Sequence, residues 1–326
     1  MIVIEINIDC INYSLIDGIN TTNHYINLGL KMSEFNFQEI LQYAWRSQLS
    51  YALTKPDWSI MKQLGWRITC PNEIYLLQVP EVDINIIVEL DHVQKIQWIA
   101  IRGTSSFKNW LEDLGHIEKT YTLEKDKEVS IEFHCGFYKA SKAVFLTIKE
   151  YLRSDYQTRI TGHSLGGAIA AILTFIMNDK NYLIEQCVTF GQPRVTKHKG
   201  EQLSHLPLLR VIDRDDIVPT IPLNTLLDWF KGDYVNFGAE IKLDNDNYVY
   251  LEQHDNHSLK PQFLWQLING YADLVFEDIK EHNMKNYLQN IIDNVEKTSG
   301  SEFDSSPVDL RYSSNRFVAQ NIVRDY

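Results

Sequence analysis

Residues 158–173, TRITGHSLGGAIAAIL, place a serine between a strand-like stretch and a run of small and aliphatic residues. The pattern predicts a short buried strand before Ser164 and a buried helix after it. Gly162 and Gly166 stand two residues to either side of the serine, where a Cβ would clash as strand and helix approach. A G-x-S-x-G pattern at such a turn strains the backbone and lifts the serine hydroxyl above the sheet edge.

Strand and helix patterns alternate on both sides of this turn. Helices are predicted over 35–53, 137–152 and 273–297, and strands over 74–79, 84–90, 96–103, 187–191 and 208–212, with two more around a turn at 244–247. The strands 84–90 and 96–103 are close enough to form a hairpin. Alternation through the middle of the chain predicts an α/β fold with a mostly parallel central sheet and helices on both faces.

The length of 326 residues suits one domain with flanking additions. We expect an N-terminal arm over 1–33, the main domain over 34–275, a C-terminal helix over 276–297, and a flexible polar tail over 298–326.

The balance of Lys+Arg 31 against Asp+Glu 43 gives a net charge of −12, which repels phosphate backbones and argues against nucleic acid as a partner. The cysteines are scattered without a C-x-x-C pair, so neither a zinc site nor a dense disulfide framework is indicated. No metal or organic cofactor is expected.

The N-terminus MIVIEINIDC alternates like a strand and lacks the basic start of a secretory signal. No apolar run approaches the ~20 residues that a membrane span needs. We therefore expect a cytoplasmic protein, with peripheral contact to membranes left open.

A nucleophilic serine needs a histidine as base and a carboxylate that orients the histidine. At such a turn the acid follows the serine in the chain, and the histidine follows the acid. Asp213, Asp215 and Asp216 all come just after the predicted strand 208–212, where open α/β sheets carry functional groups. Asp216, followed by Ile-Val-Pro, is the predicted acid.

The histidines beyond this point are His254, His257 and His282. His282 falls inside the predicted helix 273–297 and is set aside. The base is therefore expected to be His254 or His257. His163, next to the serine, is expected to be a packing or hydrogen-bonding residue and not the base, because its side chain points away from that of Ser164.

The negative oxygen formed during attack on an ester needs two N–H donors. Leu165 supplies one at the start of the predicted helix. The second is expected from Thr104, in the loop after the strand 96–103, with the threonine hydroxyl as a further donor.

Several motifs together resemble the fungal-type (class 3) triacylglycerol lipases. In the order of that family these are IAIRGTSSFKNWLEDL (99–114), HCGF (134–137), TGHSLGGA (161–168), TFGQPRV (189–195) and DDIVPTIP (215–222). The likeness covers roughly residues 34–270. It implies an α/β-hydrolase fold and a Ser-Asp-His triad that acts on carboxylic esters of glycerolipids.

By motif, Ser164 matches the nucleophile of that family, Asp216 the acid and Thr104 the oxyanion residue. His257, in HSL ahead of a predicted helix, fits the position of the base better than His254. Asn236 stands where members often carry histidine, a departure that affects packing rather than the triad.

An apolar stripe follows the expected oxyanion loop. Phe107, Trp110, Leu111 and Leu114 lie at i, i+3, i+4 and i+7. Such a helix can cover the cleft in water and turn its apolar face to lipid, or it can be a fixed helix with an ordinary core stripe. The loop 222–230 offers a second apolar surface beside the acid.

The expected partner is a glycerolipid at a membrane or lipid-droplet surface, cleaved by a triacylglycerol lipase, phospholipase or galactolipase type of activity. Two alternatives stay open: an inactive lipase-like scaffold that binds a partner or lipid, and an esterase for small soluble esters.

Overall fold

A computed structural model describes most of the expected α/β domain. It covers residues 36–52, 73–103, 118–122, 130–197, 203, 205–213, 216–220, 234–244, 247–251, 282–299 and 317–319. All of these residues belong to one compact unit, Asn36–Tyr326. The arm expected over 1–33 lies outside the described residues, and the domain boundaries stay a prediction.

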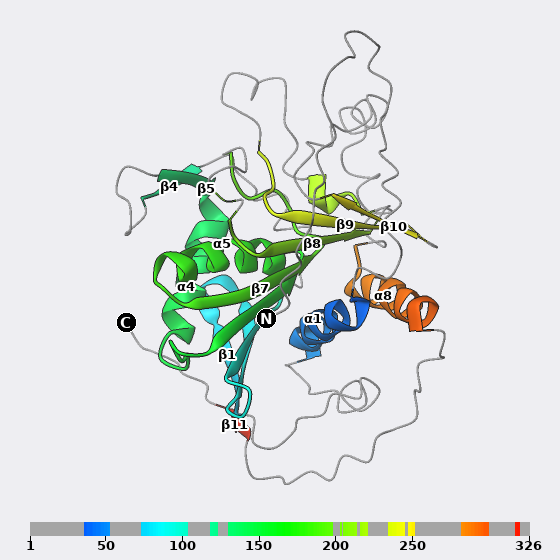
Figure 1. Cartoon of the computed structure of the whole chain (residues 1–326). Helices are drawn as coiled ribbons and strands as arrows, with labels where there is room; N and C mark the ends of the chain where they lie inside the picture. The colour runs from blue at the N-terminus through cyan, green and yellow to red at the C-terminus, as the bar shows by residue number, and fades with distance from the viewer. Residues whose placement is uncertain are drawn as a thin grey trace, which may run out of the picture. The chain divides into compact units, whose positions relative to one another are not determined.

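The described strands form one large sheet and a separate two-stranded sheet (Figure 1). The large sheet has the order β10-β9-β8-β7-β6-β3-β2-β1-β11. Its members are β1 Glu73–Val79, β2 Ile84–Asp91, β3 Ile96–Ile101, β6 Gln157–His163, β7 Leu183–Phe190, β8 Leu208–Asp213, β9 Ala239–Asp244, β10 Asn247–Leu251 and β11 Phe317–Ala319. The smaller sheet pairs β4 Glu118–Thr122 with β5 Ser130–His134.

The centre of the large sheet is parallel, as predicted. Strands β3, β6, β7, β8 and β9 pair in parallel, whereas β1, β2 and β3 are antiparallel neighbours and β10 is antiparallel to β9. Parallel strands end at the same edge, so the loops after β3, β6, β7 and β8 come together there. This arrangement confirms the predicted fold class.

The hairpin predicted between residues 84–90 and 96–103 is confirmed. Strands β2 and β3 pair over Ile86↔Ile101 through Asp91↔Ile96. At the turn, the Asp91 carboxylate accepts hydrogen bonds from the N–H groups of Val93 and Gln94, both at 2.9 Å. This side-chain turn explains why an aspartate ends the strand.

The chain near the C-terminus differs from the expectation in one respect. Residues 317–319, within the tail expected to be flexible, form β11 and pair in parallel with β1. Strand β11 has only three residues, which is too short for a periodic pattern that could be recognised in the sequence.

Helices cover both faces of the sheet (Figure 1). The helices are α1 Phe37–Leu49, α4 Cys135–Ile148, α5 Leu165–Asp179 and α8 Met284–Ser299, with short 3₁₀ turns at Ser50–Ala52, Pro80–Val82 and Val218–Thr220. Helices α4 and α5 pack together on one face, and α1 and α8 pack together on the other. Across the described residues, no helix has the length and apolar character that crossing a membrane requires.

Helix α8 begins later than the sequence predicts. The expected helix started at residue 273, but His282 and Asn283 are not helical and α8 starts at Met284. Asn283 Oδ1 accepts a hydrogen bond from the N–H of Lys285 at 3.0 Å, which is the geometry of an N-cap. His282 therefore lies before the helix and not on one of its faces.

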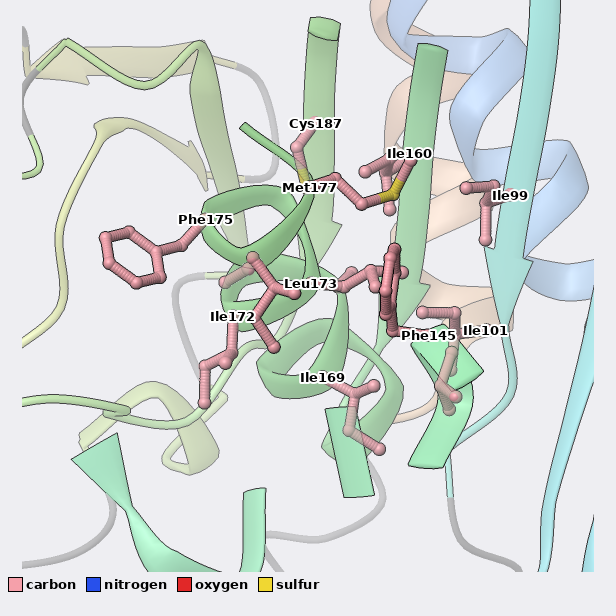
Figure 2. Packing of buried hydrophobic residues seen from close by; sticks show 14 of the residues in the cluster. Ile99, Ile101, Phe145, Ile160, Ile169, Ile172, Leu173, Phe175, Met177 and Cys187 are labelled. Carbon is pink, nitrogen blue, oxygen red and sulfur yellow. The ribbon is translucent and has the colours of Figure 1, made fainter. Parts of the chain in front are cut away.

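The core lies between α5 and the central strands. Figure 2 shows the side chains of Ile169 and Leu173 of α5 directed toward Ile99 and Ile101 of β3 and Ile160 of β6. All of these side chains are fully buried. This close packing holds α5 against the sheet, and it thereby holds Ser164, just before α5, at the end of β6.

Candidate active site

Ser164 stands between the last residue of β6 and the first residue of α5. Its backbone has φ 59° and ψ −130°, a conformation that non-glycine residues rarely adopt. The strained turn predicted from G-x-S-x-G is therefore confirmed. Strain of this kind persists only where the surrounding packing fixes it, and the side chain of Ser164 is buried.

The two glycines of the motif allow strand and helix to touch. A Cβ on Gly162 would lie 2.3 Å from the carbonyl oxygen of Gly166. A Cβ on Gly166 would lie 2.3 Å from the carbonyl oxygen of Ile101, on the neighbouring strand. Both distances are far below van der Waals contact, so any side chain at either position would push α5 away from the sheet.

The expected oxyanion donors lie at the same turn. Leu165 is the first residue of α5, so its N–H has no carbonyl one turn earlier to bind. Gly103, which follows β3, approaches the serine so closely that a Cβ on Gly103 would lie 3.2 Å from Ser164 Cβ. Thr104 follows Gly103 directly but, like Phe107, Trp110, Leu111 and Leu114, lies outside the described residues.

Asp216 lies just after β8 and is buried. Its Oδ1 accepts the N–H of Val218 at 2.9 Å, which holds the carboxylate against its own loop. Its Oδ2 accepts His282 Nδ1 at 2.7 Å and the Tyr287 hydroxyl at 2.5 Å. Asp213, the other described candidate, accepts a hydrogen bond from Asn290 instead.

His282 is a functional candidate that the sequence analysis set aside. Its exclusion rested on a place inside a helix, and that placement is wrong. The residue is buried next to Asp216, 66 positions further along the chain. The signal that could have found it is Asn283, a favourable N-cap that starts the helix after the histidine. His254 and His257 lie outside the described residues.

His163 is buried and both packs and forms a hydrogen bond, as expected. Its ring stacks on that of His282, with centroids 4.5 Å apart and an interplanar angle of 29°. On its other side, Nδ1 of His163 is hydrogen-bonded to the Tyr51 hydroxyl at 2.8 Å. Burial, and secondarily the nearby His282, hold the pKa of His163 well below its usual value, so the ring is neutral.

Gly191, in the loop after β7, lets the Asp216–His282 pair fit against the sheet. Its φ is +55°, and a Cβ there would lie 2.7 Å from Asp216 Oδ2 and 2.8 Å from His282 Cε1. The next residue, Gln192, accepts the Thr189 hydroxyl at 2.8 Å and donates to Asn236 at 3.2 Å. The TFGQPRV motif therefore packs directly against the acid and supports it.

Asn236 joins the loops after β7 and β8. Its side-chain oxygen accepts from Gln192 at 3.2 Å, and its side-chain nitrogen donates to the carbonyl oxygen of Pro219 at 3.3 Å. Pro219 lies in the short turn after Asp216. The departure noted at Asn236 thus has a structural role, because the amide both accepts and donates at once.

Together these residues supply parts of the chemistry of a serine hydrolase. Asp216 can fix the tautomer and orientation of an imidazole, and α5 offers N–H groups to an anion. Within the described residues Ser164 Oγ makes no hydrogen bond, and in ligand-free sites such bonds often form only when the substrate binds.

Similarity to known proteins agrees with this geometry. The family model for lipase (class 3) matches residues 98–226, a range that holds both Ser164 and Asp216. Over this range the chain is similar to the class 3 lipases. It is 27% identical to the lipase of Rhizomucor miehei over 149 residues, covering 43% of this chain and 41% of that protein.

Other relatives include lipases and phospholipases of fungi and plants. The secreted mono- and diacylglycerol lipase 1 of Fusarium solani is 27% identical, with 41% of this chain and 42% of that protein covered. The chloroplastic phospholipase A1-Igamma2 of Arabidopsis thaliana is 26% identical, with coverage of 53% and 42%. The alignments thus span 41% and 42% of the length of these curated relatives.

Solved structures of fungal lipases share the fold. The lipase from Rhizopus microsporus var. chinensis has a TM-score of 0.53 at 21% identity and covers 67% of this chain and 79% of its own. Lipase II from Rhizopus niveus has a TM-score of 0.52 at 20% identity, with coverage of 73% and 91%. At these identities the likeness establishes the α/β-hydrolase fold.

Proposed function

We propose that this protein hydrolyses carboxylic esters of glycerolipids with Ser164 as nucleophile. The observation that carries the proposal is the buried Asp216–His282 pair, whose hydrogen-bonded atoms are 2.7 Å apart. Asp216 and the strained serine both follow the C-terminal ends of parallel strands. A buried carboxylate that holds an imidazole has a direct use beside a nucleophile. The match of residues 98–226 to the lipase (class 3) family model supports the same reaction.

The reaction proceeds through an acyl-enzyme. Ser164 Oγ attacks the ester carbonyl carbon while a histidine takes the serine proton. The negative oxygen of the tetrahedral intermediate is stabilised by the N–H of Leu165 and by Thr104. The histidine then returns the proton to the leaving alcohol. Water, deprotonated by the same histidine, attacks the acyl group, releases the fatty acid and restores Ser164.

Two histidines are candidates for the base. The sequence pattern favours His257, and the hydrogen bond to Asp216 favours His282. Both can use the same acid in principle, since a carboxylate has about four acceptor positions and Asp216 uses three of them. Each histidine is therefore tested by its own substitution.

The substrate is proposed to be a glycerolipid at a lipid surface. Similarity to a triacylglycerol lipase, a mono- and diacylglycerol lipase and a phospholipase A1 supports an ester of glycerol. The predicted apolar helix with Phe107, Trp110, Leu111 and Leu114 would supply the contact with lipid. A cytoplasmic location stays a proposal, which fractionation of cells that express the tagged chain tests directly.

The decisive experiment compares wild type with Ser164→Ala. Release of fatty acids is measured from triacylglycerol emulsions, phosphatidylcholine vesicles and galactolipid micelles, and labelling by a fluorophosphonate probe is measured in parallel. The expected result is wild-type turnover that falls by about 10⁶ in Ser164→Ala, with the label confined to Ser164. Equal turnover in the variant would rule out the mechanism.

The two alternatives are separated in the same experiment. A folded wild-type chain that neither takes the label nor releases fatty acid would be a lipase-like scaffold. An esterase for small soluble esters would hydrolyse short-chain esters below their solubility limit and gain no rate above it, whereas an enzyme that acts at interfaces gains rate above that limit.

A further inference from the structure

A hollow of about 400 Å³ lies on the face of the molecule covered by α4 and α5, beside strand β4. Three lysines line it, Lys142, Lys149 and Lys180, together with aromatic and aliphatic side chains that include Tyr138, Phe145 and Leu146. None of its lining residues is acidic. Figure 1 shows α4 and α5 side by side in this region. The volume falls in the range of small-molecule sites, about 300–1,000 Å³.

This hollow is separate from the candidate active site. Ser164 lies at the N-terminal end of α5 and Lys180 at its C-terminal cap, with Leu165–Asp179, 15 residues, between them. At about 1.5 Å per residue the two ends are roughly 22 Å apart. A molecule in the hollow therefore does not occupy the place where an ester would meet Ser164.

The charge of the hollow is opposite to that of the whole chain. The net charge is −12, yet three ammonium groups gather at one place. Lys142 and Lys149 are exposed, and neither forms an ion pair within the part of the chain that the structure describes. The partial negative charge at the C-terminal end of α5 attracts cations, so a preference for anions must come from these lysines.

The floor of the hollow is apolar. Leu146 is 49% exposed, one of few large aliphatic side chains in the described residues with so much surface in water. Phe145 also lines the hollow, and Lys180 Nζ is 5.7 Å from the centre of the Phe145 ring. A cation over an aromatic ring keeps a positive charge next to an apolar surface. Apolar surface and positive charge thus meet within one small site.

We propose that this hollow binds the carboxylate form of a fatty acid. The carboxylate lies among Lys142, Lys149 and Lys180, and the alkyl chain covers Phe145 and Leu146. Lysines act as point charges and suit a single carboxylate, whereas phosphate sites favour the fork of arginine or a cradle of backbone N–H groups. No arginine is among the residues that line this hollow. The proposal does not depend on hydrolysis at Ser164.

The test is isothermal titration of the full chain with decanoate at concentrations at which it stays monomeric. Wild type is compared with the double variant Lys142→Glu/Lys149→Glu, whose side chains are exposed and whose replacement leaves the core intact. Lys285→Glu/Lys297→Glu changes the net charge equally at exposed positions of α8 and is the matched control. Circular dichroism melts verify that all three proteins are folded.

We expect saturable binding to wild type and the control, with at least tenfold weaker binding to Lys142→Glu/Lys149→Glu. Exposed ion pairs each change affinity by a few-fold, and reversal of two charges replaces attraction by repulsion. The neutral analogue 1-decanol is expected to bind wild type at least tenfold more weakly than decanoate. A second variant, Leu146→Asn, is expected to weaken decanoate without changing the charge.

Three results would overturn the proposal: equal decanoate binding to wild type and the lysine variant, equal binding of 1-decanol, or binding to anionic phospholipid vesicles with none to decanoate. Treatment with a fluorophosphonate separates this site from the one at Ser164. Binding in the hollow is expected to survive that treatment. If the chain takes no label at all, the proposed hydrolysis fails, but the titration still decides whether the hollow binds decanoate.

Discussion

His282 Nδ1 lies 2.7 Å from Asp216 Oδ2, and both side chains are buried at the edge of the sheet. Removal of this imidazole is expected to lower kcat in His282→Ala. If His282 is the base, the substitution lowers kcat by about 10⁶. If His282 only holds Asp216, the substitution removes a hydrogen bond to a charged group and lowers kcat roughly 10- to 100-fold.

His257→Ala is the reciprocal variant, and steady-state release of fatty acid is the measurement for both. One of the two substitutions is expected to show the 10⁶-fold loss that marks the base. A His282→Ala protein with the kcat of wild type would show that the contact with Asp216 has no part in turnover.

Tyr287 donates its hydroxyl to the same oxygen of Asp216 at 2.5 Å. Burial, with the nearby Asp216 charge, raises the pKa of Tyr287 well above its usual value, so the hydroxyl stays a donor throughout the working pH range. Tyr287→Phe is expected to lower kcat about tenfold, since one donor to the carboxylate is lost. Tyr182→Phe, which keeps its ring contact with Phe145, is the control and is expected to match wild type.

Alanine substitutions at Gly191 and Gly238 separate the cost of backbone strain from the effect of a clash with Asp216 and His282. Both have positive φ, +55° and +86°, so alanine is strained at either position. At Gly191 the added Cβ meets Asp216 and His282, whereas at Gly238 it meets Leu208. Both variants are expected to lose stability in urea. Only Gly191→Ala is expected to lose kcat per folded molecule, and an equal loss in both would contradict this.

The sequence was sufficient for features that depend on neighbours in the chain. The turn at Ser164 follows from glycines two residues away, and the β2–β3 hairpin from two close strand patterns and an aspartate that ends the first. The acid could be ranked because Ile-Val-Pro follows Asp216 and fixes its loop, where the Val218 N–H binds the Asp216 carboxylate. Such local patterns report backbone geometry, which short-range sterics determine.

The surroundings of Asp216 could not be predicted in the same way. His282 and Tyr287 reach it from 66 and 71 residues away, and only the packing of α8 brings them there. The periodicity of apolar residues locates the start of a helix only to within a few residues. The sequence pattern therefore assigns His282 to the helix, although it precedes the helix in the structure. Buried polar networks of this kind are a tertiary property.

Arg210 and Glu240 form an ion pair between β8 and β9, where their side chains are 1% and 3% exposed. Arg210→Met is expected to cost roughly 3–5 kcal/mol of unfolding free energy because it leaves a carboxylate buried without its cation. Arg210→Met/Glu240→Leu is expected to recover most of that loss, since well-packed apolar pairs often replace buried ion pairs at little cost. Urea unfolding measures both, and a double variant as unstable as the single one would contradict the explanation.

His163 makes stability depend on pH in a defined direction. Its pKa in the folded protein lies well below the unfolded value, which is about 6.5, first because of burial and then because of His282. Below pH about 6.5 the unfolded chain binds a proton that the folded chain does not, so the unfolding free energy falls as pH falls, by up to about 1.4 kcal/mol per pH unit.

Urea unfolding of wild type and His163→Gln between pH 5 and 8 measures the difference in slope. The variant is expected to lose less stability toward pH 5, whereas Val93→Gln, at an exposed residue that does not titrate, is expected to keep the wild-type slope. Parallel curves for wild type and His163→Gln would show that His163 is protonated in the folded state as easily as in the unfolded one.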